Sequence, residues 1–114
     1  EVLQESIDIE YSNLQDGKIS PSEYIIITEV TSSQVTTQIS EFVTSKPSEK
    51  WQESYISYMN GMKKFNEYII ETKVLANQIE NESADTKILE TINKIEAIKL
   101  ESIEHIKKSN ELRP

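Results

Sequence analysis

The feature that most constrains this chain is a helical stripe that runs from Trp51 to Ile79. Apolar, aromatic or small side chains recur along it in steps of three and four, which is the spacing of one helix face. The stripe consists of Trp51, Tyr55, Tyr58, Met62, Phe65, Ile69, Thr72, Ala76 and Ile79. A helix this long has to bury its stripe against other elements, so the rest of the chain must supply them.

The boundaries of this helix follow from its prolines and glycines. Lys46-Pro47 precedes it, and a residue before proline avoids the helical region, so we expect the helix to begin near Ser48. Asn60-Gly61 is typical of a turn when it stands alone. Because the stripe passes through it unbroken, we predict a continuous helix with a close approach of another element at Gly61.

Two other segments carry the same spacing. A short helix is predicted over residues 2–16, and Gly17 suits the left-handed position that ends it. Its face consists of Leu3, Ile7, Tyr11 and Leu14. The pattern lapses around residues 81–85, where Ser83 can cap a last helix that ends near Arg113. That helix carries Ile88, Ile92, Ile95, Ile98, Ile103 and Ile106.

The segment 21–45 gives conflicting signals. It is rich in β-branched side chains, which favour strands. Its apolar and small residues nevertheless alternate by three and four, and Ser20-x-x-Glu23 with Pro21 is a helix-starting capping box. No partner strand is apparent elsewhere. We predict a helix here, with a frayed or partly extended segment as the alternative.

Together these segments predict an all-α fold, an antiparallel up-down helical bundle of one short and three long helices within a single domain, 1–114. The apolar fraction is 36%, which indicates a narrow core. Two glycines and three prolines are too few for the frequent turns of a β-sandwich or barrel.

Charge and composition exclude several classes of function. The net charge of −8 disfavours nucleic acid as a partner and docking on an anionic lipid surface. The absence of cysteine excludes disulfides and thiol catalysis. No apolar run approaches the ~18 residues of a transmembrane segment. The start at Glu1 and the 22 Ser and Thr residues are typical of an exported protein, so we expect a secreted or surface-tethered, extracytoplasmic domain.

One stretch suggests a metal site. Asp16-Gly17-Lys18-Ile19-Ser20-Pro21-Ser22-Glu23 resembles the second half of an EF-hand calcium loop, with glycine, apolar and acidic residues at the loop's sixth, eighth and twelfth positions. The first half departs from the pattern, because Ser12 and Leu14 stand where charged ligands are needed. We therefore expect a capped turn between two helices, with a weak calcium site as the alternative.

Two surfaces are candidates for partner contacts. Five of the eight aromatic residues lie between Trp51 and Tyr68, and those on the stripe are predicted to fill the core. Tyr68 falls just off the stripe and is predicted to be exposed, whereas an open bundle end near Trp51 can form an aromatic pocket. The second surface is a ridge of hydroxyls, Ser33, Thr37, Ser40 and Thr44, on a helix with little charge.

Nothing in the sequence indicates catalysis. His105 is the only histidine, and Ser102 stands three residues before it where a di-iron site needs glutamate. No glycine-rich phosphate loop is present, so we predict no catalytic, metal-binding or cofactor-binding residues. We expect a non-enzymatic helical bundle with a protein-binding or structural role, and homo-oligomers are possible. The alternative is a small-ligand- or ion-binding domain, with its site at residues 16–23 or near Trp51.

Overall fold

The computed structural model describes residues 2–114, with side-chain surroundings from Glu5 onward, so the predicted role of Leu3 lies outside the described residues. It contains α1 (Val2–Gln15), α2 (Pro21–Thr44), the 3-10 helix η1 (Glu49–Trp51), α3 (Gln52–Glu80) and α4 (Asp85–Glu111). Over this range there is no strand. The prediction of an all-α bundle with one short and three long helices is confirmed.

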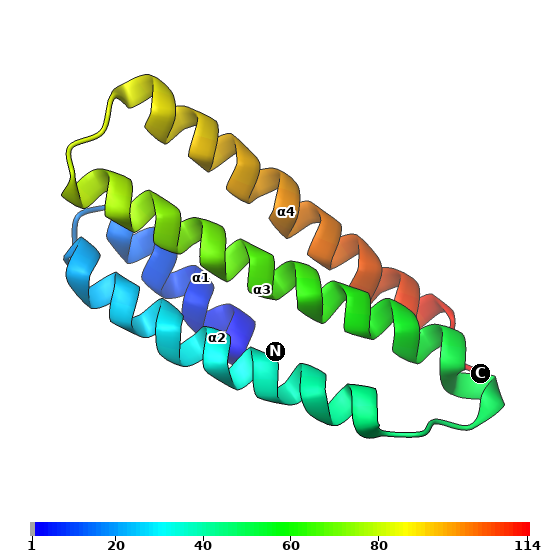
Figure 1. The fold of residues 1–114 in the computed structure, drawn as a ribbon. Helices are drawn as coiled ribbons and strands as arrows, with labels where there is room; N and C mark the ends of the chain where they lie inside the picture. The colour runs from blue at the N-terminus through cyan, green and yellow to red at the C-terminus, as the bar shows by residue number, and fades with distance from the viewer. Residues whose placement is uncertain (1) are drawn as a thin grey trace.

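The helices are arranged around α3, as Figure 1 shows. α2 and α4 pack on opposite sides of α3, and α1 packs against α2 and α3 in one half of the molecule. The bundle is long and thin, measuring 50 × 24 × 17 Å. Its narrow core is therefore a line of side chains along α3 and not a central sphere.

The segment 21–45, whose sequence gave conflicting signals, is helical from Pro21 to Thr44. Ser20 caps it by accepting a hydrogen bond from the Glu23 N–H at 3.1 Å. The buried face carries Tyr24, Thr28, Thr31 and Val35. Each buried threonine hydroxyl donates to a carbonyl of its own helix, Thr28 to Ile25 at 2.7 Å and Thr31 to Ile27 at 2.8 Å, so burial leaves no donor unpaired.

The contact between α3 and α4 is made by small residues. Ser54 Oγ donates to the carbonyl of Ser109, and Ser109 Oγ donates to the carbonyl of Ser54, both at 2.8 Å. Ser102 Oγ donates to the carbonyl of Gly61 at 2.8 Å. A Cβ at Gly61 would lie 2.6 Å from Ile106 Cγ1, so the predicted close approach at Gly61 is confirmed.

The sequence predicted the buried face of α4 only in part. Ile95 is buried, but Ile103 is 43% exposed, although the sequence placed it on the core stripe. The other buried positions of α4 are Thr91, Ser102 and Ser109. The prediction failed because Ser102 and Ser109 face α3, where their hydroxyls donate to the carbonyls of Gly61 and Ser54, and Ile103 lies to the side of this face.

Two helix–helix turns lie at the same end of the bundle. In each of them, a residue in the left-handed region terminates the preceding helix. After α1, Gly17 has φ +73° and Lys18 N–H donates to Asn13 O at 2.8 Å, as expected for the glycine at a helix end. After α3, Glu82 has φ +53° and Ser83 N–H donates to Gln78 O at 2.9 Å. The predicted Ser83 cap is therefore wrong: Ser83 completes the end of α3, and Ala84 precedes α4 without a side-chain cap.

The Gly61 contact can be tested by double substitution. We expect Gly61→Ala to lower the free energy of unfolding by up to about 2 kcal/mol, because overpacking typically costs about 1–3 kcal/mol and the helix-propensity gain of alanine offsets about 1 kcal/mol of that cost. In an Ile106→Ala background the clashing atoms are absent, so the same substitution should stabilise the protein. Urea unfolding measures both values; equal effects in the two backgrounds would contradict the close contact.

The left-handed Glu82 predicts a stabilising substitution. Glu82→Gly removes a Cβ that is disfavoured at positive φ, so we expect about 0.5–1 kcal/mol of added stability in urea unfolding. The matched control is Glu90→Gly, at an exposed position inside α4, which should cost about 1 kcal/mol. Destabilisation at both positions would show that residue 82 is not left-handed in solution.

Candidate functional site

α1 lies in a groove that the other three helices form. Its Tyr11 ring packs against Tyr24 of α2 and Tyr68 of α3, with ring centroids 6.4 and 6.1 Å apart. Its Asp8 carboxylate pairs with Lys99 of α4 at 3.3 Å. α1 therefore lies over α3, between α2 and α4.

The described helices differ in length. α1 has 14 residues, whereas α2, α3 and α4 have 24, 29 and 27. At about 1.5 Å per residue, α1 spans roughly 20 Å beside helices of roughly 36 to 44 Å. In Figure 1, α1 lies beside one half of the bundle, and the α2–α3 connection lies in the other half, which we call the three-helix end because its described residues belong to α2, η1, α3, α4 and the segments that join or follow them.

The three-helix end contains a hollow of about 480 Å³, which we call the aromatic hollow. Its lining comes from α2, η1, α3 and α4: Phe42, Trp51, Ser54, Tyr55, Tyr58, Ser109 and Arg113. The predicted pocket near Trp51 thus has a counterpart in the structure. Trp51 itself is 40% exposed, so its predicted place in the core is wrong, because it lies in the 3-10 turn that no other helix covers.

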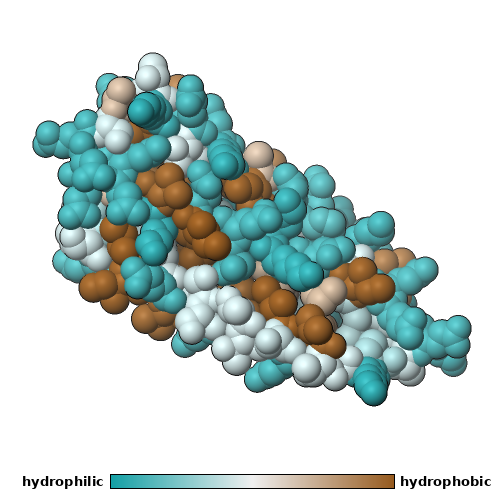
Figure 2. Space-filling model, viewed as in Figure 1, coloured by the Kyte–Doolittle hydropathy of each residue, from teal (hydrophilic) through white to brown (hydrophobic). Residues whose placement is uncertain are grey.

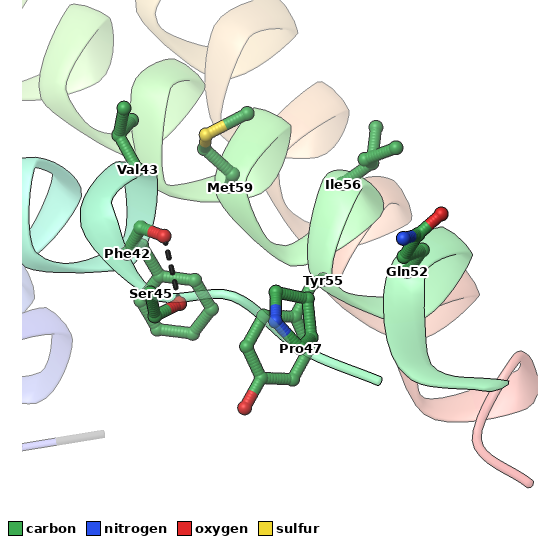
Figure 3. Close-up of a pocket in the computed structure, with 8 residues that line it drawn as sticks. All are labelled: Phe42, Val43, Ser45, Pro47, Gln52, Tyr55, Ile56 and Met59. Atoms are coloured by element: carbon green, nitrogen blue, oxygen red, sulfur yellow. Dashed lines mark hydrogen bonds between the residues drawn. The ribbon is translucent and has the colours of Figure 1, made fainter. Parts of the chain in front are cut away.

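A second, smaller pocket of about 260 Å³ lies between the ends of α2 and α3, and we call it the apolar pocket. Figure 3 shows its lining residues, Phe42, Val43, Ser45, Pro47, Gln52, Tyr55, Ile56 and Met59. Ser45 Oγ donates to the carbonyl of Phe42 at 2.8 Å, which holds the chain where it leaves α2. Val43 and Ile56 are 61% and 54% exposed, so the pocket opens onto apolar surface.

Aromatic packing determines the shape of this end. The Phe42 ring lies 5.1 Å from the Tyr55 ring and 4.9 Å from the Tyr58 ring, tilted in both pairs. Phe42 and Tyr55 line both the aromatic hollow and the apolar pocket. Phe42 and Tyr55 therefore separate the two pockets, so a ligand bound in either pocket would contact these two rings.

Tyr68 was predicted to be an exposed contact, and the structure contradicts this. It is only 1% exposed, and its hydroxyl donates to Asp8 Oδ1 at 2.8 Å. Burial raises the pKa of Tyr68 far above its usual value, and the hydrogen-bonded Asp8 carboxylate raises that pKa further. The prediction failed because α3 is covered by α1, α2 and α4 together, so its buried face is wider than the stripe that the sequence displays.

The ridge of Ser33, Thr37, Ser40 and Thr44 is exposed, as the sequence predicted. Two of its hydroxyls bond to their own helix: Thr37 donates to Ser33 O and Thr44 to Glu41 O, both at 3.0 Å. The buried positions of α2 lie on the opposite face of that helix. The ridge therefore does not line the aromatic hollow, and its role in partner contact stays a prediction.

The turn at residues 16–23 forms the capped connection expected of it, through Gly17 and the Ser20 cap. α1 continues to Gln15, so Ser12 and Leu14 are helical and a twelve-residue loop is not formed. Ile19 packs against the core. Within the described part of the chain, no group of three or more acidic or histidine side chains is arranged to hold a metal ion.

Comparison with protein-family models, with curated proteins and with solved structures found no match for this chain. None of the helices in the described range is long and apolar enough to cross a membrane. The surface with the most distinctive chemistry is the three-helix end, where aromatic side chains and Arg113 gather.

The tyrosine cluster under α1 gives a test of the groove. Tyr11 Oη is buried without a hydrogen-bond partner among the described residues, whereas Tyr24 Oη donates to Thr72 Oγ1 at 2.8 Å. We expect Tyr11→Phe to leave stability at pH 7 unchanged or raised by up to about 1 kcal/mol, and Tyr24→Phe to lower it by about 1 kcal/mol. Urea unfolding of both variants gives the comparison.

The same cluster predicts a dependence on alkaline pH. Burial, with a contribution from Glu96, raises the pKa of Tyr11 to about 12 from an ordinary value of 10. Its contribution to stability is therefore present below pH 10 and is lost as the pH rises from 10 through about 12, because the unfolded tyrosine ionises first. Tyr11→Phe should reduce this loss, and an unchanged alkaline profile would contradict the burial of Tyr11.

Proposed function

We propose that this chain is a non-enzymatic helical-bundle module that binds a partner protein through its three-helix end, in an extracytoplasmic setting. The observation that carries the proposal is the aromatic hollow, where a half-exposed Trp51 stands beside Phe42, Tyr55 and Tyr58. The serine- and threonine-rich composition supports the setting.

The composition of this end is that of a protein-binding surface. Trp, Tyr and Arg are the residues most enriched at the energetic centres of interfaces, and the hollow contains all three. Val43 and Ile56 extend the apolar surface next to it. Figure 2 shows apolar patches on one face of the bundle, separated by polar surface, so no single apolar patch covers that face.

A binding role suits the chemistry of the hollow better than catalysis does. Its polar groups include the hydroxyls of Ser54 and Ser109, which donate to each other's backbone carbonyls across α3 and α4. The others belong to lining residues that are also aromatic or basic: Trp51, Tyr55, Tyr58 and Arg113. A hydroxyl engaged in a structural bond lacks the adjacent base that would activate it as a nucleophile. The lining can supply apolar contact and one positive charge.

Site-specific crosslinking tests the proposal. A photoreactive benzoylphenylalanine at position 51 of the full chain, expressed in its native source, should capture a partner that the same label at Ser33 does not. The captured protein is then identified, purified and titrated against the unlabelled chain by calorimetry. We expect Trp51→Ser to weaken binding at least tenfold, because buried tryptophans at interface centres contribute about 2 kcal/mol or more.

Ser33→Ala is the matched control and should change the affinity less than twofold, since Ser33 lies on the exposed ridge. Capture that is equal at positions 51 and 33, or a purified partner that binds Trp51→Ser as tightly as the unsubstituted chain, would overturn the proposal.

A second candidate function, binding of a small apolar molecule, is favoured by the apolar pocket. Its 260 Å³ is near the lower end of the range for ligand sites, roughly 300 Å³, and its lining is mostly apolar. The two methionines supply an internal control, because Met59 lines the pocket and Met62 is buried in the core. Indole should shift the methyl NMR signal of Met59 and leave that of Met62 in place. An unmoved Met59 signal up to the solubility limit would exclude this ligand class.

A further inference from the structure

We infer that Asn81 is the acceptor of an N-linked glycan. Asn81-Glu82-Ser83 matches the acceptor pattern, an asparagine followed two residues later by serine or threonine with no proline between them. The inference rests on the extracytoplasmic setting of the proposed function, because such glycans are added to exported chains.

The pattern by itself carries no weight in a chain of this composition. Serine and threonine make up 22 of the 114 residues, and there are seven asparagines, so chance supplies 7 × 22/114, or about one, such match. The deciding observation is the place of the match in the fold.

Asn81 is the one asparagine of the chain that lies outside a helix. The other six lie inside α1, α3 or α4: Asn13, Asn60, Asn66, Asn77, Asn93 and Asn110. A chance match would therefore fall inside a helix in six cases of seven. The asparagine in a turn is also the one with a hydroxyl residue two positions later.

A helix would keep the two recognised groups apart. Residues i and i+2 of a helix lie about 200° apart around its axis and do not face each other. A transferase that contacts both the asparagine amide and the hydroxyl therefore cannot reach them on one helix face. After Asn81, Glu82 has φ +53°, so the backbone leaves the helical path between the two groups.

The backbone of this turn is held in place, whereas its acceptor groups are unengaged. Asn81 N–H donates to Asn77 O at 3.0 Å, and Ser83 N–H donates to Gln78 O at 2.9 Å. Neither the Asn81 side-chain amide nor the Ser83 hydroxyl forms a hydrogen bond with another described residue. Asn81 and Glu82 are exposed, and Ser83 is half-buried. A glycan on Asn81 Nδ2 would therefore extend into solvent and break no hydrogen bond of the described fold.

The modification is a group transfer to the Asn81 side chain. The co-reactant is an oligosaccharide that a diphosphate links to a lipid. Asn81 Nδ2 forms a bond to C1 of the first sugar, and the bond between C1 and the diphosphate oxygen breaks with its electron pair left on that oxygen. The amide nitrogen releases one proton to the transferase or to water, so nothing is oxidised or reduced.

The glycan would lie far from the proposed binding surface. Asn81 follows the last residue of α3 and Trp51 precedes the first. At about 1.5 Å per residue, α3 separates them by roughly 45 Å. Figure 1 shows the α3–α4 and α2–α3 connections at opposite ends of the bundle. A glycan on Asn81 would therefore not compete with a partner at Trp51.

Mass spectrometry of the full chain from its native source tests the inference. The protein is digested to peptides and treated with peptide N-glycosidase in heavy-oxygen water, which converts a glycan-bearing asparagine into aspartate that contains heavy oxygen. After subtraction of a blank without the enzyme, we expect this label at Asn81 and at least tenfold less of it at the six helical asparagines. Asn81 without label would overturn the inference.

Substitution of Ser83 separates the acceptor pattern from the fold. Ser83→Ala removes the hydroxyl, and Ser83→Thr is the matched control because it keeps the pattern. Neither change removes a hydrogen bond of the described structure, since the Ser83 hydroxyl forms none. In the native source, Ser83→Ala should lower the label at Asn81 at least tenfold, and Ser83→Thr should retain it. Equal labelling of the two variants would overturn the inference.

The cell fraction from which the protein is recovered distinguishes failure of this inference from failure of the proposed function. Protein outside the cytoplasm with unlabelled Asn81 would overturn the glycan alone. Protein found only in the cytoplasm with unlabelled Asn81 would overturn the glycan and the proposed setting together. Partner binding is tested separately, by crosslinking at Trp51 at the other end of the bundle.

Discussion

The close contact between α3 and α4 is the constraint on which the rest of the bundle depends. Gly61 leaves room for the Ile106 side chain of α4 against the α3 backbone, and reciprocal bonds between Ser54 and Ser109 link the two helices. α4 packs on one side of α3, and the remaining faces of α3 contact α2 and α1. The groove and its aromatic lining both follow from the central position of α3. A larger residue in the contact would move every wall of the groove at once.

Helical periodicity predicted the fold, but it did not predict which faces were buried. The stripe from Trp51 to Ile79 and its unbroken spacing at Gly61 were enough to predict α3. An apolar repeat of that length fits few structures other than a helix. Tyr68 and Ile103 were assigned to the wrong environments. Burial of Tyr68 depends on three neighbouring helices, and exposure of Ile103 on a contact made by serines; neither can be read from the spacing within one helix.

The candidate site was predictable only in outline. The concentration of aromatics after Pro47 indicated that something distinctive lies near Trp51, and the structure has a hollow there. Arg113 could not have been linked to Phe42 from sequence, since they are brought together only when α4 returns along α3.

The two ends of the bundle also differ in how the chain turns. Both left-handed turns, at Gly17 and Glu82, lie at one end, where Ser22 Oγ also donates to Glu80 Oε1 at 3.2 Å. The other end has an extended connection around Pro47, and the described part of α1 lies in the opposite half of the bundle. Local opening of the native state therefore begins at that end, because it has fewer buried contacts to break. A molecule bound there would slow the first step of unfolding, so occupancy of one end would set the lifetime of the whole fold.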